Sequence, residues 1–367
     1  MNIKSNLRKI TELGIGLTAV AILALAGCGG GGGDGAPASV VVSTLVDSSS
    51  RHFVPADITS DGTYLYVTDT VNNNILKIDI ATKAVTILAG DINGVSGTAN
   101  APVGTDAKFN LPWGIALDST NTKLYVADSH NHTIRQIDLA ASAAVTTFAG
   151  IMNTPGWADT ATGVTATLDY PMGIGRIGSH LFVADGRNTI RKIDLANAAV
   201  STLAGSAVAP GGNHDGTGAS AVMYGPVGIA TDGASFVYAT EYFNNNVRRI
   251  NATTGETMLV AGGNYSLPSS GVGSTDANGM SARFNHPYGI TTDGTNLYVT
   301  DTYNHTIRKI VIATGFVSTP AGAVLVPGNT DGSGPNARFN NPTGIVYVNG
   351  TLYVADFTNG SIRKIQP

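Results

Sequence analysis

The chain has 367 residues, of which 13% are charged, and its formal net charge at pH 7 is −4. Soluble proteins average about 25% charged residues, and here Gly, Thr, Asn and Ala make up much of the difference, which favours short strands joined by tight turns. The slightly acidic balance gives no basic footprint, so we expect no nucleic-acid binding. The single cysteine, Cys28, excludes an intrachain disulfide.

The first 27 residues have the pattern of an export signal. Lys4, Arg8 and Lys9 precede a mostly apolar stretch over residues 13–27, which is the order of a secretory signal peptide. The stretch is short and interrupted by Gly, which argues against a transmembrane helix. We therefore expect residues 1–27 to be a signal peptide.

The end of this stretch, Leu25-Ala26-Gly27-Cys28, resembles the lipobox of bacterial lipoproteins. The resemblance implies cleavage before Cys28 and attachment of lipid to that residue, and several acyl chains would anchor the protein stably because each buried methylene contributes about 0.8 kcal/mol. A free cysteine or an uncleaved signal anchor is the alternative. Gly29, rather than Asp, follows the cysteine, which implies the outer membrane of the cell envelope in a Gram-negative bacterium.

Residues 28–39 should form a flexible tether between the lipid and a folded domain. Gly29 to Gly33 are consecutive glycines, and Asp34-Gly35-Ala36-Pro37 follows them. Such a segment cannot bury apolar surface and behaves as a random coil.

Residues 40–367 consist of a sequence repeat with a spacing of 55 to 61 residues. Each copy contains Pro-x-Gly-Ile or a close variant, an apolar run that ends in an acidic residue, a polar loop and a run such as Ile-Arg-Lys-Ile. The repeat prolines are Pro55, Pro112, Pro171, Pro226, Pro287 and Pro342, and the acidic residues are Asp69, Asp128, Asp185, Glu241, Asp301 and Asp356. A period of this size indicates a repeat architecture.

Each copy contains four strand-like runs, which in the second copy are residues 115–117, 124–127, 134–137 and 145–148. They are rich in β-branched and aromatic residues and are bounded by Asp, Asn and Gly. Both alternating faces are largely apolar, so each small sheet should be covered on both sides. The sequence therefore predicts an all-β, six-bladed β-propeller of four-stranded antiparallel blades.

The two ends of the repeat region predict how the ring closes. The sixth copy ends at Pro367 without a fourth strand, whereas Val42-Ser43-Thr44-Leu45 matches the fourth strand Val200-Ser201-Thr202-Leu203. We expect Val40–Val46 to supply the outer strand of the last blade, which would remove an open strand edge.

The segments from Asp128 to Arg135, Asp-Ser-His-Asn-His-Thr-Ile-Arg, and from Asp301 to Arg308, Asp-Thr-Tyr-Asn-His-Thr-Ile-Arg, resemble NHL-repeat propellers. The resemblance extends over about residues 40 to 367 and implies a six-bladed propeller. The family includes protein scaffolds, ligand-sensing ectodomains, lyases and RNA binders, so it does not select a function.

An arginine also recurs in most copies, at Arg135, Arg191, Arg248, Arg308 and Arg363. A feature repeated in nearly every blade is better explained by folding than by a single site. We expect the repeated acid to accept N–H bonds from the loop that follows it, and the arginine to pair with a carboxylate.

Strand alternation places the long connections between blades and the loops between second and third strands at one face of the ring, where binding residues concentrate. Exposed aromatic side chains with an arginine suit recognition of a protein, peptide or glycan, and packing among the loops is the alternative. The candidate binding residues are Trp113, His130, Arg187, Tyr242, Phe243, Tyr288, Tyr303 and Phe357.

Evidence for a cofactor is slight, and none is predicted. The chain has no Gly-x-Ser-x-Gly motif, phosphate-binding loop or Cys–His pair. Asp57, which replaces the Gly of the repeat, and His286 could contribute to a divalent metal site, calcium for example. The acidic turns at Asp215 and Asp331 are too short for an EF-hand loop and are interpreted as turns.

Two hypotheses about function follow. The first is a lipid-anchored extracytoplasmic module that binds a protein, peptide or glycan through its loop-rich face. The alternative follows from the resemblance, because six-bladed relatives include lactonases and lyases with a metal at the mouth of the channel. The absence of a catalytic motif favours the binding module over the enzyme.

Overall fold

The computed structural model describes residues 40–49, 52–140, 142–263 and 272–366. The chain divides into two units, Met1–Ser39 and Val40–Pro367, and only the second is described below. The predicted signal peptide, the lipid attachment site Cys28 and the tether all lie outside the described residues. No helix among the described residues is long and apolar enough to cross a membrane.

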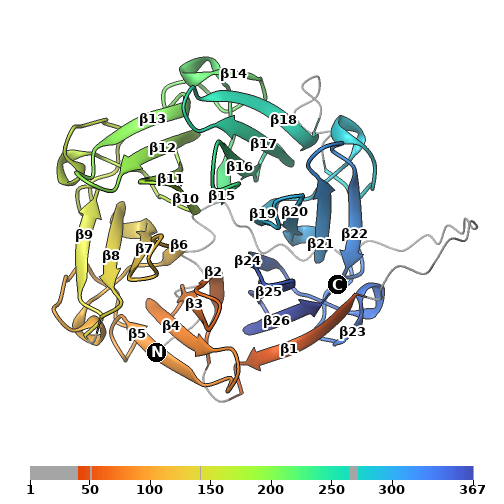
Figure 1. Cartoon of the computed structure of the whole chain (residues 1–367), viewed down its shortest axis with the longest axis horizontal. Helices are drawn as coiled ribbons and strands as arrows, with labels where there is room; N and C mark the ends of the chain where they lie inside the picture. The colour runs from red at the N-terminus through yellow and green to blue at the C-terminus, as the bar shows by residue number, and fades with distance from the viewer. Residues whose placement is uncertain (1–39, 50–51, 141, 264–271, 367) are drawn as a thin grey trace, which may run out of the picture. The chain divides into compact units, whose positions relative to one another are not determined.

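Residues from Val40 onward form six antiparallel sheets, or blades, arranged in a ring (Figure 1). Blades 1 to 3 comprise β2 (Pro55–Ser60), β3 (Tyr64–Asp69), β4 (Asn74–Asp79), β5 (Val85–Ala89); β6 (Pro112–Leu117), β7 (Lys123–Asp128), β8 (Thr133–Asp138), β9 (Val145–Ala149); and β10 (Ile174–Ile177), β11 (His180–Asp185), β12 (Thr189–Asp194), β13 (Val200–Gly205). Blades 4 to 6 comprise β14 (Gly216–Thr217), β15 (Pro226–Thr231), β16 (Phe236–Glu241), β17 (Asn246–Asn251), β18 (Glu256–Gly262); β19 (Pro287–Thr292), β20 (Asn296–Asp301), β21 (Thr306–Val311), β22 (Val317–Ala321); and β23 (Gly332–Ser333), β24 (Pro342–Val348), β25 (Thr351–Asp356), β26 (Ser361–Gln366), β1 (Val41–Asp47). The predicted all-β, six-bladed fold is confirmed.

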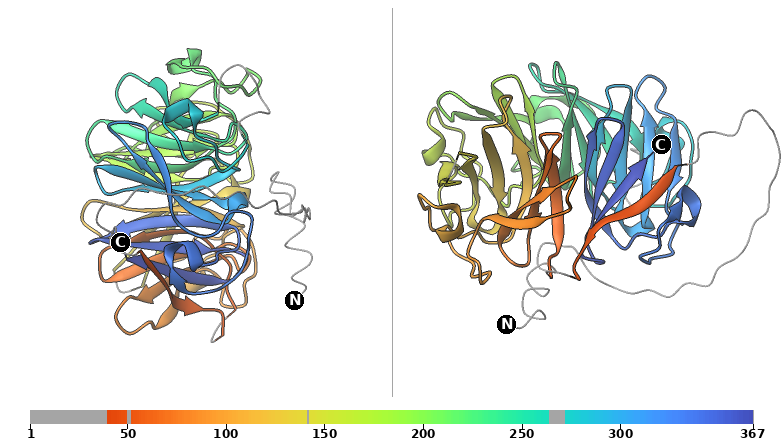
Figure 2. Two further views of the ribbon diagram at one scale, coloured as in Figure 1. Left: turned by 90° about the vertical axis from the view of Figure 1, so that its right-hand side faces the viewer. Right: turned by 60° about the horizontal axis from the view of Figure 1, so that its bottom comes forward.

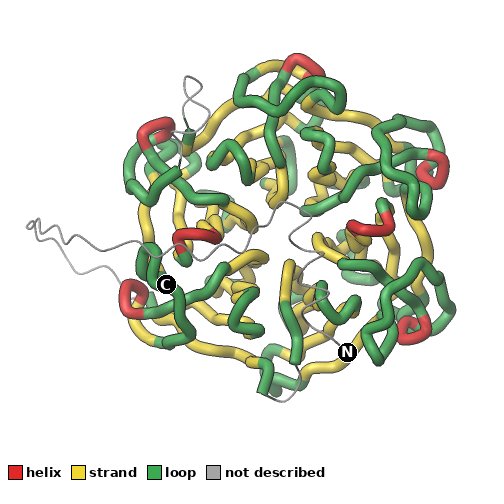
Figure 3. The backbone as a smooth tube through the Cα atoms, turned by 180° about the vertical axis from the view of Figure 1, so that it is seen from behind, coloured by secondary structure: helices red, strands yellow, loops and turns green. Residues whose placement is uncertain are grey.

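Short 3₁₀ turns punctuate the connections, both at the rim of the ring and nearer its centre (Figure 3). They are η1 (Gly104–Asp106), η2 (Ser129–Asn131), η3 (Gly163–Thr165), η4 (Gly218–Ser220), η5 (Gly279–Ser281), η6 (Thr302–Asn304) and η7 (Gly334–Asn336).

The first residue of the repeat defines two faces of the ring. Pro112 at the start of β6 pairs with Asp128 at the end of β7, and Leu117 pairs with Leu124. The loop after Asp128 and the connection that reaches Pro112 therefore meet at one face, which we call the loop face. The turns between first and second strands lie at the opposite face, the turn face; Figure 2 shows the strands running between the two.

The N-terminal strand closes the ring as predicted. β1 pairs with β26 on one side and with β23 on the other, antiparallel in both cases. Thr44 donates its N–H and its hydroxyl to the two oxygens of Asp331, at 3.0 and 2.9 Å. Val42 and Leu45 are buried in the core of the last blade, so β1 contributes apolar contacts as well as hydrogen bonds.

The hydrophobic core lies between blades rather than in a single centre. One cluster joins Tyr66 and Ile75 of blade 1 to Ile115, Leu124 and Val126 of blade 2. Similar clusters occupy other interfaces around the ring. This explains why both faces of each strand are apolar in the sequence.

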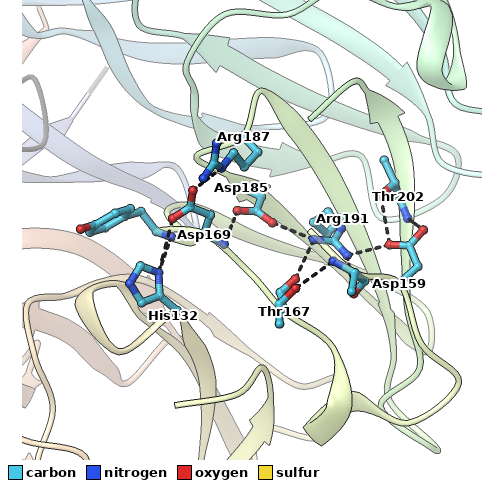
Figure 4. Close-up of polar contacts among 10 residues, drawn as sticks. His132, Asp159, Thr167, Asp169, Asp185, Arg187, Arg191 and Thr202 are labelled. Atoms are coloured by element: carbon cyan, nitrogen blue, oxygen red, sulfur yellow. Dashed lines mark hydrogen bonds and ion pairs between the residues drawn. The ribbon is translucent and has the colours of Figure 1, made fainter. Parts of the chain in front are cut away.

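A buried ion pair ties each of blades 2 to 6 together from within. In blade 3, Arg191 pairs with Asp185 at 2.8 Å, and neither side chain has accessible surface. The same guanidinium reaches the Thr167 carbonyl at 3.1 Å and the Asp159 carboxylate at 2.6 Å, both in the connection from the preceding blade (Figure 4). Equivalent pairs join Arg135, Arg248, Arg308 and Arg363 to Asp128, Glu241, Asp301 and Asp356.

The acid of this pair binds a different loop from the one expected. Asp128 accepts the N–H of Asn110 at 2.7 Å, and Glu241 accepts that of Tyr224 at 2.9 Å. Both donors lie in the connection before the blade's first strand, not in the loop after the acid. The following loop contributes a side chain instead, because Asn131 donates its amide to Asp128 at 2.7 Å. Each acid therefore fastens two segments at the loop face.

The Asn-His signature of the repeat also has a structural role. Several residues before a repeat proline adopt positive φ, and their N–H groups are held by the blade before. Tyr170, at φ 48°, donates its N–H to His132 Nδ1 at 3.1 Å. Asn341 donates to His305 Nδ1 at the same distance, and Asn73 Oδ1 accepts the N–H of Leu111 at 2.8 Å. These bonds link neighbouring blades.

Removal of β1 should destabilise the propeller. A variant that begins at residue 51 lacks the pairing to β26 and exposes the edge of the last blade, so we expect a clearly lower melting temperature than for a variant that begins at residue 36. Circular dichroism during heating would compare the two. Equal melting temperatures would contradict closure by β1.

The buried acid should contribute far more to stability than the exposed acid on the same arginine. Asp301 and Arg308 are fully buried, whereas the side chain of Asp276, which also binds Arg308, is 43% exposed. Breaking a buried pair costs about 3–5 kcal/mol, and an exposed pair about 0–1 kcal/mol. We expect Asp301→Asn to lower the free energy of unfolding in urea much more than the control Asp276→Asn; similar losses would contradict this.

Candidate functional site

The first strands of the six blades line a central cavity of about 340 Å³. Its wall is a ring of isoleucines, one from each blade: Ile58, Ile115, Ile174, Ile229, Ile290 and Ile345. The cavity reaches the turn face, where Asp118, Asn121 and Arg176 line it. The surface that a small ligand could enter is thus at the face opposite to the long loops.

An aromatic layer fills the loop-face end of the channel. Trp113 of blade 2 and Tyr288 of blade 5 come from opposite sides of the ring, yet their ring centroids are 5.3 Å apart. Phe357 lies 6.1 Å from Trp113, and Tyr242 lies 6.3 Å from Tyr288. We call these four residues the aromatic plug, because together they cover the channel axis.

The expectation that these four candidates are exposed is wrong. Trp113 is 1% exposed and Tyr288 4%, and Tyr242 and Phe357 are also buried. The positions after the repeat proline point inward, where large rings fill the narrow end of the ring of blades. Within the described ranges, neither Trp113 Nε1 nor the Tyr288 hydroxyl has a hydrogen-bond partner, so the inner side of the plug retains two polar atoms.

His286 belongs to the same aromatic packing. Its ring lies 4.4 Å from that of Tyr242 and 4.6 Å from that of Tyr303, and the two tyrosine hydroxyls are 2.9 Å apart. His286 Nδ1 is 2.8 Å from Asn285 Oδ1, and burial lowers the pKa of the imidazole. Across the described residues, no group of three His, Cys, Asp or Glu side chains is placed to hold a metal ion.

Asp57 lies in the channel, at a position where the other five blades have glycine. A Cβ on Gly114 would lie 2.1 Å from the Met172 carbonyl, and one on Gly289 2.0 Å from the Thr343 carbonyl, so those blades pack too closely for a side chain. At Asp57 the side chain fits, lines the cavity and accepts the N–H of Ile115 at 3.2 Å. No described Lys, Arg or His forms an ion pair with it, and its surroundings raise the pKa of this carboxyl to about 7.

A second group of aromatic residues is exposed on the loop face over blades 3 and 4. It comprises Trp157, Tyr170, Tyr224 and Phe243, with Arg187 among them, and we call it the aromatic patch. Trp157 is 46% exposed and Tyr224 42%. Large apolar rings at the surface, grouped rather than scattered, mark interaction sites.

Contacts join the two halves of the aromatic patch. The Arg187 guanidinium lies 5.1 Å from the centre of the Trp157 ring and pairs with Asp169, which also faces His132 (Figure 4). The next residue, Asn188, accepts the N–H of Gly225 at 2.9 Å. This bond connects the Arg187 loop to the segment that carries Tyr224.

The remaining rings of the patch are stacked on neighbours. Tyr224 and Phe243 lie 4.6 Å apart with their planes 28° from parallel. Tyr170 packs edge-on against His130 at 5.1 Å and against His132 at 4.6 Å. These contacts limit the freedom of the rings, and preorganised rings lose less entropy when a partner binds.

The structure therefore divides the sequence candidates into two groups. Arg187, Phe243 and His130 belong to or adjoin the aromatic patch, whereas Trp113, Tyr242, Tyr288 and Phe357 form the plug, with Tyr303 beside it. Trp157, Tyr170 and Tyr224 were not singled out from the sequence. Their signal was available, because aromatic residues in variable connections have no role that the repeat requires.

Comparison with known proteins agrees with the repeat and the fold. The family model described as the NHL repeat matches residues 109–137 and 339–365. The protein Suppressor of Quenching 1 of Arabidopsis thaliana is 30% identical over 272 residues, which cover 71% of this chain and 25% of that protein. NHL repeat-containing protein 2 of Gallus gallus is 28% identical over 350 residues, covering 85% of this chain and 46% of that one. The chain thus spans less than half the length of the curated relatives it matches.

Solved structures with the same fold have diverse descriptions. An auxiliary nutrient binding protein of Bacteroides thetaiotaomicron has a TM-score of 0.65 at 15% identity, with 89% of this chain and 76% of that chain covered. A streptogramin B lyase has a TM-score of 0.53 at 15% identity, covering 89% and 98%. A gluconolactonase of Xanthomonas campestris has a TM-score of 0.55 at 11% identity, covering 89% and 88%.

At these identities the structural matches support the fold alone. The repeat matches fall in blades 2 and 6, and the remaining four blades share their strand order, their acidic residue and their first-strand register. The chain belongs to the NHL-repeat β-propellers.

Proposed function

We propose that this protein is a binding module of the bacterial cell envelope, held by lipid on Cys28, which captures a protein partner through the aromatic patch. The observation that carries the proposal is the grouping of four exposed aromatic rings and one arginine on the loop face. The lipobox resemblance supports the location, and Gly29 after the cysteine favours the outer membrane in a Gram-negative cell.

The chemistry of the patch suits a protein surface. Tryptophan, tyrosine and arginine are the residues that most often dominate the binding energy of protein interfaces. Each offers a large contact area, and Arg187 adds hydrogen-bond donors beside the Trp157 ring. A peptide would use the same contacts, and a glycan could stack on the same rings, so both are outcomes of the test below.

The enzyme hypothesis has less support. A metal-dependent lactonase or lyase needs several ligands at the channel mouth, and the two candidates considered, Asp57 and His286, lie in different surroundings. His286 packs between tyrosines of the loop face, whereas Asp57 faces the cavity. Relatives in fold include a lyase and a gluconolactonase as well as a nutrient binding protein, so the fold does not choose between these activities.

Truncation of the patch should weaken partner capture. A photo-crosslinking amino acid at Tyr224 should yield a defined adduct in intact cells, and the purified partner should then bind Trp157→Ala or Phe243→Ala at least roughly 30-fold more weakly, since loss of an interface hot spot costs about 2 kcal/mol or more. Phe316→Ala is the matched control, because Phe316 is an equally exposed ring in a turn of blade 5 at the turn face.

Several results would contradict this assignment. Unchanged affinity in both patch variants, or an equal loss in Phe316→Ala, would exclude the patch as the interface. Binding of an oligosaccharide on a glycan array, lost in Trp157→Ala, would replace the protein partner with a glycan.

Lipid attachment should depend on the single cysteine. We expect Cys28→Ser to lose metabolic labelling by palmitate and to move from the membrane fraction to the soluble fraction, while Gly30→Ala, which keeps the lipobox, should behave as the wild type. Membrane retention of Cys28→Ser without a label would instead indicate an uncleaved signal anchor.

A further inference from the structure

We propose that the inner end of the central channel is a binding site for a small organic ammonium ion, with the Asp57 carboxylate as its counter-charge and the isoleucine ring around its aliphatic body. The site is separate from the aromatic patch and opens to the opposite face.

The first argument is that the fold does not require an acid at this position. Gly114, Gly173, Gly228, Gly289 and Gly344 occupy it in the other blades. A carboxylate placed among apolar residues without a cation costs stability. Residues that lower stability where the fold needs none of their chemistry are characteristic of functional sites.

The second argument is charge. The Asp57 side chain lines the cavity and accepts one backbone N–H, from Ile115. Among the described residues no cationic side chain pairs with it, so a positively charged ligand would supply the missing partner. Its raised pKa is consistent with this, because it reflects a carboxylate that the surrounding protein stabilises poorly.

The third argument is the plug directly above Asp57. The Asp57 charge interacts with the Tyr288 hydroxyl, and that hydroxyl oxygen has no partner within the described ranges. An ammonium group has three donors, one for the carboxylate and one for this oxygen. The neighbouring Trp113 and Tyr288 rings also suit a cation, because aromatic rings attract one electrostatically.

The walls and length of the channel select an organic ion over a metal. Calcium takes six to eight oxygen ligands, whereas no trio of acids or histidines converges among the described residues. The six isoleucines offer apolar contact instead. Asp57 lies two residues after its repeat proline and Arg176 five residues after, a difference of three residues or about 10 Å along the strands, which leaves room for a body of a few carbons.

The test uses the mature full chain and simple probes. We expect n-butylamine and n-hexylamine hydrochloride, at pH 8 and constant ionic strength, to raise the melting temperature and to give a saturable calorimetric signal, whereas n-butanol should do neither. Asp57→Gly should lose at least tenfold in amine affinity, as should Asp57→Asn, which preserves the size of the side chain. Asp118→Asn is the matched control, because it removes a carboxylate at the channel mouth, and it should bind as the wild type.

Asp57→Gly restores the residue that the other five blades contain, so it should fold and the comparison should remain interpretable. Equal amine binding by the wild type and Asp57→Gly would overturn the proposal, as would equal binding of amine and alcohol. Binding of calcium or magnesium chloride that depends on Asp57, without binding of amines, would overturn it in favour of a metal site.

Discussion

The buried pair between a repeated acid and a repeated arginine is the interaction on which the loop face depends. Charges without water must be neutralised and fully hydrogen-bonded, and here the neighbours of the pair are backbone groups of the connection from the preceding blade. In blade 3, Asp185 and Arg191 together hold Asp169, Thr167 and Asp159. A long connection is thereby fixed at several points, and Tyr170 emerges from it at a defined place on the surface.

The two ends of the channel have different chemistry because the blades approach most closely near the repeat proline. Large rings close that end, where five glycines allow neighbouring first strands to touch. The other end widens into a cavity with polar residues at its rim. A macromolecule can reach only the loop face patch, and a small molecule can reach only the cavity, so the proposed sites can act independently.

Family membership explains the features that recur and leaves the others to this chain. The acid, the arginine and the Asn-His signature are repeated, and each has a bond within or between blades. Trp157, Tyr224 and Asp57 occur once each, at positions that the repeat does not constrain. The functional proposals rest on these single residues, since function lies in sites added to a fold.

The sequence by itself determined the repeat, the number of blades, the strand order and the closing strand, because these follow from local apolar patterns copied six times in register. It also indicated that the acid–arginine pairs are structural. Only the tertiary structure decided which aromatic residues are exposed. Trp113 and Tyr288 are 175 residues apart in sequence, and their contact across the axis depends on the curvature of the whole ring. The same closure leaves Asp57 facing a cavity, because local sequence does not report the distance between opposite blades.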